Sequence, residues 1–152
     1  MNTLLNELHA YHHDMGNKIS QIRKLLKKLK HEPDATDDCK LLFEMLEALH
    51  SNAERHHHEN EEIIRRALLA TEAPIHPRIL DIERDHQAFA RIAGQLKTLA
   101  ATTKDTKVIA DTVDDYIEKY YDHMESEENI FFPAADKWLS NSQWLEIKHQ
   151  WH

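Results

Sequence analysis

Two short segments of the sequence pair a histidine with a glutamate four residues later: His57 with Glu61, and His123 with Glu127. An α-helix turns once in about 3.6 residues, so the two side chains of each pair lie one above the other on one helix face. Imidazole and carboxylate groups without thiolates suit iron, manganese, zinc or copper. The two pairs therefore predict two metal-binding helix faces that can converge on one volume.

Two more histidines occupy positions where a helix would face a protein core. His12 and His86 lie at equivalent places in two apolar seams, spaced alternately by three and four residues. These seams are Leu5, Leu8, His12, Met15, Ile19, Ile22, Leu26 and Leu29, and Ile79, Ile82, His86, Phe89, Ala93 and Leu96. A further seam runs through Ile109, Val113, Tyr116, Tyr120, His123, Glu127, Ile130 and Ala134. Ionisable groups in the middle of apolar seams must find compensating partners when they are buried.

A pair of metal ions would compensate all six groups at once. Burying such groups without partners would cost several kcal/mol each. Glutamates able to bridge two ions favour a dinuclear centre, and the residues alone do not choose among iron, manganese, zinc and copper. Six ligands on two ions leave coordination positions open for a small molecule. We therefore expect the metal ligands to be His12, His57, Glu61, His86, His123 and Glu127.

Several neighbouring residues remain alternatives. His13 is the main rival to His12, whereas His56 and His58 point away from the seam and are expected to be solvated or to support the ligands. Glu62 and Glu128 could supply a third carboxylate, although a solvated surface position is the simpler interpretation. A further pair, His50 and Tyr116, lies two turns before His57 and His123, and both residues could line the pocket or simply pack.

The elements that must position these residues are four long helices. The expected spans are Thr3 to Lys30, Asp38 to Thr71, Pro77 to Ala101 and Thr106 to Ser140, separated by short breaks at 31–38, 73–77 and 102–105. Short connections favour antiparallel neighbours, hence an all-α, up-down-up-down four-helix bundle. The length of 152 residues suits a single domain, residues 1–152. A short fifth helix is expected around Trp144, Leu145 and Ile147.

Composition and charge exclude several classes of partner. With two glycines and four prolines, the chain lacks the turn residues that a sheet of many strands needs. The net charge of -8 and the scattered basic residues argue against binding to nucleic acid or anionic lipid. No apolar run approaches a membrane span and no signal peptide is evident, so we expect a cytoplasmic protein. The lone Cys39 is expected to be a bystander thiol.

The order His, then His-x-x-x-Glu, then His, then His-x-x-x-Glu resembles the hemerythrin-like, or HHE cation-binding, family over nearly the whole chain. The segments around His57 and His123, with the following Phe131-Phe132-Pro133, look especially like the C-terminal domain of the Repair of Iron Centres di-iron proteins. The resemblance implies a bundle with a carboxylate-bridged centre of two non-haem iron ions, with manganese or zinc as possible substitutes. It implies the same six ligands, taken position by position.

The sequence departs from oxygen-carrying hemerythrins at two places. Those proteins place a second histidine one turn after the third-helix ligand, where this chain has Ala90. They also place an aspartate five residues after the fourth-helix histidine, where Glu128 stands, whereas Glu127 follows His123 by four. Both departures argue against reversible oxygen carriage.

Two classes of function fit these observations. One is a redox-active di-iron protein that acts on O2, nitric oxide or peroxide, with nitrosative or oxidative stress or iron-centre repair as its expected settings and an electron donor as its partner. The alternative is a module that senses or stores O2, nitric oxide or iron without catalytic turnover. A metal-free structural bundle would instead be indifferent to chelators. No particular oligomeric state is expected.

Overall fold

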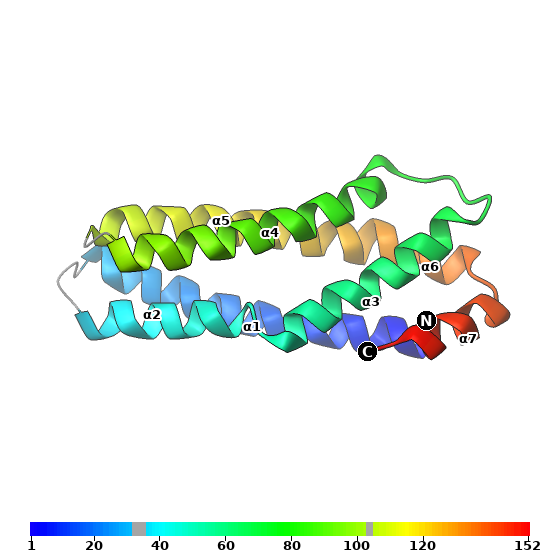
Figure 1. The fold of residues 1–152 in the computed structure, drawn as a ribbon, viewed down its shortest axis with the longest axis horizontal. Coiled ribbons are helices and arrows are strands. Elements are labelled where there is room, and N and C mark those ends of the chain that lie inside the picture. The colour runs from blue at the N-terminus through cyan, green and yellow to red at the C-terminus, as the bar shows by residue number, and fades with distance from the viewer. Residues whose placement is uncertain (32–35, 103–104) are drawn as a thin grey trace.

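The computed structural model describes residues 1–31, 36–102 and 105–152, with the side chains of 36–39 and of 100 and 101 left out. This part of the chain forms helices and no strand (Figure 1). The elements are α1 (Thr3–His31), α2 (Thr36–Ala48), α3 (Asn52–Leu69), α4 (Pro77–Thr102), α5 (Thr106–Ser126), η1 (Glu127–Phe131), α6 (Phe132–Trp138) and α7 (Asn141–Gln150). The expected bundle is confirmed, with α2 and α3 sharing one arm and α5, η1 and α6 another. The expected connections at 32–35 and 103–104 and the side chain of Cys39 lie outside the described part.

The second predicted helix is broken, which corrects the expectation of one span from Asp38 to Thr71. α2 ends at Ala48 and α3 begins at Asn52. Ser51 caps the new helix, because its hydroxyl accepts a hydrogen bond from the backbone amide of Glu54 at 3.4 Å. A capping serine satisfies one of the amides that a helix start leaves without a partner. After the break, α3 slants away from the line of α2 toward the end of the bundle where α6 and α7 lie (Figure 1).

The fourth predicted helix changes from α-helical to π-helical geometry at Glu127, one of the predicted ligands. After α5, the five residues of η1 form a π-helical turn, in which each backbone bond spans five residues instead of four. The seam consequently shifts by one position: Phe131 and Ala135 are buried, whereas the expected Ile130 and Ala134 are only partly buried. The extra residue therefore separates the register of α6 from that of α5.

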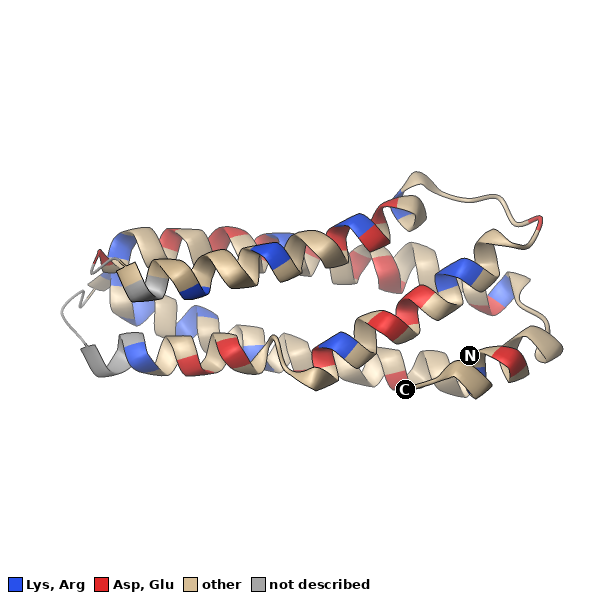
Figure 2. Cartoon of the chain, in the orientation of Figure 1, with Lys and Arg blue, Asp and Glu red and all other residues tan. Residues whose placement is uncertain are grey.

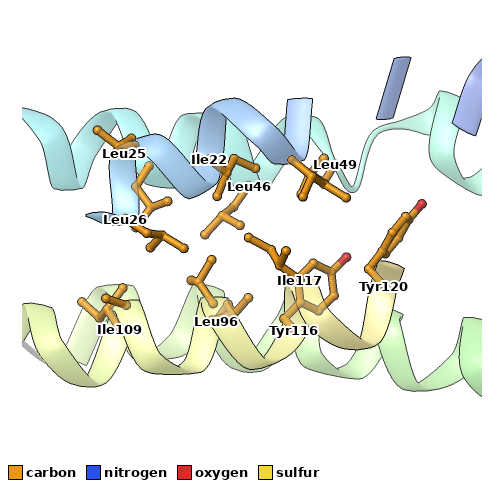
Figure 3. Packing of buried hydrophobic residues seen from close by; sticks show 14 of the residues in the cluster. Ile22, Leu25, Leu26, Leu46, Leu49, Leu96, Ile109, Tyr116, Ile117 and Tyr120 are labelled. Carbon is orange, nitrogen blue, oxygen red and sulfur yellow. The ribbon is translucent and has the colours of Figure 1, made fainter. Parts of the chain in front are cut away.

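The apolar core consists of two clusters along the bundle axis. One cluster joins the later half of α1 with α2, α4 and α5, and includes Leu26, Leu46 and Ile117 (Figure 3). The other joins the start of α1 with α3, α6 and α7, and includes Leu5, Ile64 and Phe132. The expected fifth helix is confirmed as α7, which buries Trp144 and Ile147 in this second cluster, while Leu145 stays exposed. Between the clusters lies a layer of buried polar residues.

Charged residues of both signs alternate along the outer faces of the helices (Figure 2). Neither sign forms a single dominant patch over a helix in this view, in keeping with the scattered charges of the sequence. Within the described residues, none of the helices combines the length and apolar character needed to cross a membrane.

Candidate metal centre

All six predicted ligands lie in the polar layer between the two apolar clusters. His12 comes from α1, His57 and Glu61 from α3, His86 from α4, and His123 from α5, followed by Glu127 at the start of η1. Their side chains are buried, and both glutamates have no exposed surface at all. Residues from four arms of the bundle thus meet in one volume, as the seams predicted.

The distances divide the cluster into two halves that share carboxylates. Within the expected pairs, the ring nitrogen Nε2 of His57 lies 3.1 Å from Oε1 of Glu61, and Nε2 of His123 lies 2.9 Å from Oε1 of Glu127. Glu61 also lies 3.5 Å from Nε2 of both His12 and His86. Each half has donor atoms within 4.8 Å of one another: Glu61, His86, His123 and Glu127 in one, and His12, His57 and Glu61 in the other.

The histidine rings face each other through the same nitrogen. Nε2 of His12 is 3.0 Å from Nε2 of His57, and Nε2 of His86 is 3.1 Å from Nε2 of His123. A hydrogen bond between two such nitrogens requires a proton on one and a lone pair on the other. When all four Nε2 atoms carry lone pairs, they instead face each other two by two, which is how imidazoles are arranged around a cation.

The hydrogen bonding of the two central carboxylates, Glu61 and Glu127, shows whether these residues fit a cation. All four oxygens of Glu61 and Glu127 are buried and have no hydrogen-bond partner among the described residues, since the nearby ring nitrogens lack hydrogen-bond geometry. Buried polar atoms without partners are rare and costly. Two cations among the four imidazoles would satisfy these oxygens, so the donor set fits a pair of metal ions.

The buried carboxylates also favour positive charge within the cluster, as the pKa values of its histidines indicate. Burial would lower the pKa of His12, but Glu128, Glu61 and Glu127 outweigh burial and raise the pKa to about 10. The pKa of His123 rises to about 9 in the same way, against burial, through Glu127 and Asp85. For Glu61, burial would raise the pKa, yet the neighbouring His57 and His12 hold the pKa well below its ordinary value. A metal-free cluster would therefore attract protons to its histidines.

Carboxylates at the edge of the cluster contact the outer nitrogens of three histidines. Glu128 lies 2.8 Å from Nδ1 of His12, Glu62 lies 3.4 Å from Nδ1 of His86, and Asp85 lies 3.0 Å from Nδ1 of His123. A carboxylate on Nδ1 fixes the ring and leaves Nε2 free as a metal donor. Glu128 is thus a hydrogen-bond partner of His12, whereas Glu62 lies near His86 without a hydrogen bond and accepts one from Arg65 instead. Both side chains are partly buried and in contact with other side chains, so they are not simply solvated surface groups.

Glu54 is a buried residue that the sequence analysis missed. Its carboxylate accepts hydrogen bonds from the hydroxyls of Tyr11 and Tyr120 and lies 2.8 Å from Nε2 of His58. Burial would raise the pKa of Glu54, but His58 and the two hydroxyls outweigh burial and lower the pKa to about 2. The signal was present, because Glu54 precedes Glu61 by seven residues, or two turns, on the same helix face.

The same network supports two rings of the cluster. Tyr11 stacks on His57 with ring centroids 4.0 Å apart, and His58 stacks on His86 at 3.9 Å. Of the two roles considered for His58, support of the ligands is therefore the one that the structure favours. Phe132 stacks on His12 at 5.4 Å and closes the cluster on the side of the second apolar cluster.

The other candidates from the sequence occupy different places. His13 is exposed, so it does not compete with His12. His50 and Tyr116 contact each other at a ring distance of 5.7 Å, and each has a buried polar atom without a hydrogen-bond partner in the described part. His56 lies at the surface beside the end of the chain.

A cleft of about 760 Å³ opens beside the cluster, between α3 and α4. Its wall includes the ligand candidate His86, its neighbours His58 and Glu62, and the apolar side chains of Phe89 and Ala90. Because His86 belongs to both the cleft and the cluster, the cleft gives the centre a route to solvent.

Comparison with known proteins agrees with this geometry. A family model described as the hemerythrin HHE cation binding domain matches residues 3–135. Neither the curated proteins nor the solved structures give a match. The matched region contains every residue of the buried cluster. The chain therefore belongs to the hemerythrin HHE cation-binding domain family.

Proposed function

We propose that the buried cluster is a dinuclear iron centre that handles O2, nitric oxide or peroxide. In this proposal His12 and His57 would hold one ion, and His86 and His123 would hold the other. Glu61 and Glu127 would supply carboxylate oxygens to both ions, since each lies within 3.5 Å of a histidine of each half. The observation that carries the proposal is the set of four buried carboxylate oxygens without hydrogen-bond partners, surrounded by four imidazole nitrogens.

The donor set suits iron, manganese or zinc, and we propose iron because the chain belongs to the hemerythrin HHE cation-binding domain family. It combines imidazole and carboxylate donors, and no cysteine takes part. Bound iron would supply open coordination positions and one-electron chemistry for the small molecule. A role in stress protection or in iron-centre repair belongs to the same proposal, since either role would use a di-iron centre that reacts with small oxidants.

The side chains around the centre would control access to it. The cleft leads to His86, where Phe89 and Ala90 provide apolar contact for a diatomic or peroxide. Ala90 offers no donor, so a ligand entering there would compete with no protein group for an open position. On the opposite side, Phe132 packs on His12 and excludes water. Access is thus proposed to run through one side of the bundle.

The first test is metal content. Protein expressed with ample iron and purified without a tag or chelator should contain about two irons per chain, as expected for the six-ligand dinuclear centre. The variants Glu61→Ala and His123→Ala should lose metal while circular dichroism still shows a helical protein. Full metal content in both variants would refute the ligand assignment.

The second test separates an enzyme from a sensing or storage module. The iron-loaded protein is reduced and then mixed with O2, nitric oxide or hydrogen peroxide while its absorption spectrum is followed. Repeated consumption of the small molecule in the presence of excess reductant indicates an enzyme. A spectral change that reverses when the small molecule is removed, with no turnover, indicates binding or sensing.

A further inference from the structure

A second group of metal-binding side chains lies outside the buried centre. His56 and Glu59 stand three residues apart on α3, and His152 packs beside them after α7. One donor atom from each side chain lies within 4.8 Å of the other two. None of these residues takes part in the buried cluster, and the three side chains are partly or fully accessible to solvent.

The main chain holds His152 against α3. The backbone amide of His152 donates a hydrogen bond to Oδ1 of Asn60 at 2.9 Å, and its carbonyl accepts one from Nδ2 of Asn60 at 3.5 Å. Asn60 itself is buried. The imidazole of His152 is therefore brought to His56 by backbone contacts, and the two rings lie nearly parallel at a centroid distance of 5.5 Å.

We propose that His56, Glu59 and His152 form a surface site for a divalent transition-metal ion such as Zn²⁺. Two imidazoles and one carboxylate are a common donor set for such ions, with a fourth position left to water. Nε2 of His152 already lies 3.4 Å from Oε2 of Glu59. That spacing matches the distance of about 3.4 Å between neighbouring donors around a tetrahedral ion, given metal–donor bonds of about 2.1 Å.

The competing contact of the carboxylate is weak. Arg55 lies 3.6 Å from Oε1 of Glu59, but both side chains are exposed, and ion pairs of this kind contribute little. Oε2 remains directed to His152. Rotation of exposed side chains can close the remaining distances without moving the helix, so the site can form when the ion arrives.

The surface site is open to solvent, whereas the ligands of the proposed di-iron centre are buried. Glu59 and His152 line the same cleft that reaches His86, but they stand at its outer part, where solvent is in contact with them. An ion bound there would exchange with solution without any opening of the bundle. At the buried centre, by contrast, the ligand candidates are buried, and His86 is the one among them that lines the cleft.

Calorimetric titration with Zn²⁺ tests the proposal on tag-free protein already loaded with iron. The wild-type chain should bind one Zn²⁺ per chain while elemental analysis shows its iron retained. The variants His56→Ala and His152→Ala should weaken this binding by about tenfold or more, since each removes one ligand. His152→Ala keeps the backbone bonds to Asn60, so the loss would not come from release of the segment.

His31→Ala is the matched control, because His31 is also an exposed histidine and stands at the end of α1. This variant should bind Zn²⁺ as the wild type does. Equal Zn²⁺ affinity in the wild type and in both ligand variants, or no Zn²⁺ binding by the iron-loaded wild type, would overturn the proposal. If the buried centre fails to take iron, the same titration on metal-free protein must still show one equivalent fewer in His152→Ala than in the wild type.

Discussion

Carboxylates at the edge of the cluster set which ring nitrogen of a histidine points toward the centre of the bundle. Glu128 contacts Nδ1 of both His12 and His9, each at 2.8 Å. With Nδ1 engaged, the ring of His12 is held with Nε2 toward the centre of the bundle. The negative charge of the carboxylate that contacts Nδ1 also makes the ring a stronger donor to a cation. Glu128 thus contributes to metal binding without being one of the proposed ligands.

Glu128→Gln should therefore lower the affinity of the buried centre for iron. The amide keeps the size of the side chain but removes the charge, and loss of such a supporting group typically costs about 10–100-fold in metal affinity. Competition with a chelator of known affinity measures the effect. Glu118→Gln, an exposed glutamate on α5, is the control. Identical affinities for Glu128→Gln and the wild type would show that the contact with His12 is incidental.

Glu54→Gln should destabilise the metal-free protein in a pH-dependent manner. The pKa of Glu54 is about 2 in the folded chain, below its ordinary value, so its stabilising effect is present above about pH 4.5 and is lost as the pH falls toward 2. At pH 7 the variant should lose about 3 kcal/mol of unfolding free energy, an upper estimate from the size of that shift.

Urea denaturation of the wild type and Glu54→Gln between pH 3 and 7 gives this difference directly. The difference should shrink steadily as the pH drops below about 4.5. A constant difference over the whole range would mean that the variant acts through packing with Tyr11 and Tyr120, and that the charge of Glu54 is not involved.

At the scale of elements, the break between α2 and α3 sets where the ligands of α3 stand. Ser51 caps the start of α3, six residues before His57. Ser51→Ala should cost about 1 kcal/mol, the usual effect of losing a capping side chain, and should lower the melting temperature by about 2–4 °C. Ser51→Asp should keep most of the stability, because aspartate also caps helices. Thermal denaturation followed by circular dichroism tests both, and equal losses in the two variants would contradict the capping role.

The sequence contained the signal for this break, although the apolar seam concealed it. Ser51 and Glu54 have the spacing of a helix-start motif, a serine followed three residues later by a glutamate. Leu46 and Leu49 nevertheless continue the apolar pattern up to the break, and both are buried. Periodicity alone therefore predicted one long helix where the chain forms two.

The π-helical turn could not be read from the sequence in the same way. Seam spacing placed Glu127 on the buried face beside His123, and Glu127 is indeed buried there, one helical turn after that histidine. Beyond that point, the wider turn moved the buried positions from Ile130 and Ala134 to Phe131 and Ala135. Both sets are apolar, so hydrophobicity did not distinguish them. Only the packing of Phe131 and Phe132 against the rest of the bundle selects the register.

For the whole molecule, the three apolar seams and the two matching His-x-x-x-Glu segments were enough to predict the bundle and to bring His12 and His86 together with the two pairs. Apolar periodicity carries this information because every helix must bury one face. The cleft and the buried Glu54 network depend instead on how α3 and α4 lie beside each other. The relative placement of two helices is set by tertiary packing, and the apolar pattern of one helix does not predict it.

Metal binding should stabilise the entire fold. Ions that bind only the folded chain raise the unfolding free energy, by about 2.7 kcal/mol when the free ion is at 100 times its dissociation constant. Adding ferrous iron under reducing conditions should therefore raise the melting temperature of the metal-free protein, and a chelator should reverse the rise. Glu61→Ala should show no comparable shift. An unchanged wild-type melting temperature would favour a metal-independent bundle.

The division of the apolar core into two clusters bears on how the chain unfolds. One cluster holds Ile22 and Ile117, the other holds Ile64 and Phe131, and the polar layer lies between them. In a metal-free chain that layer couples the two ends poorly, because its carboxylates lack hydrogen-bond partners. Amide hydrogen exchange should then report two cooperative units with different opening free energies. Cations in the layer would tie the ends together, and the amides of both clusters would exchange through a single global opening.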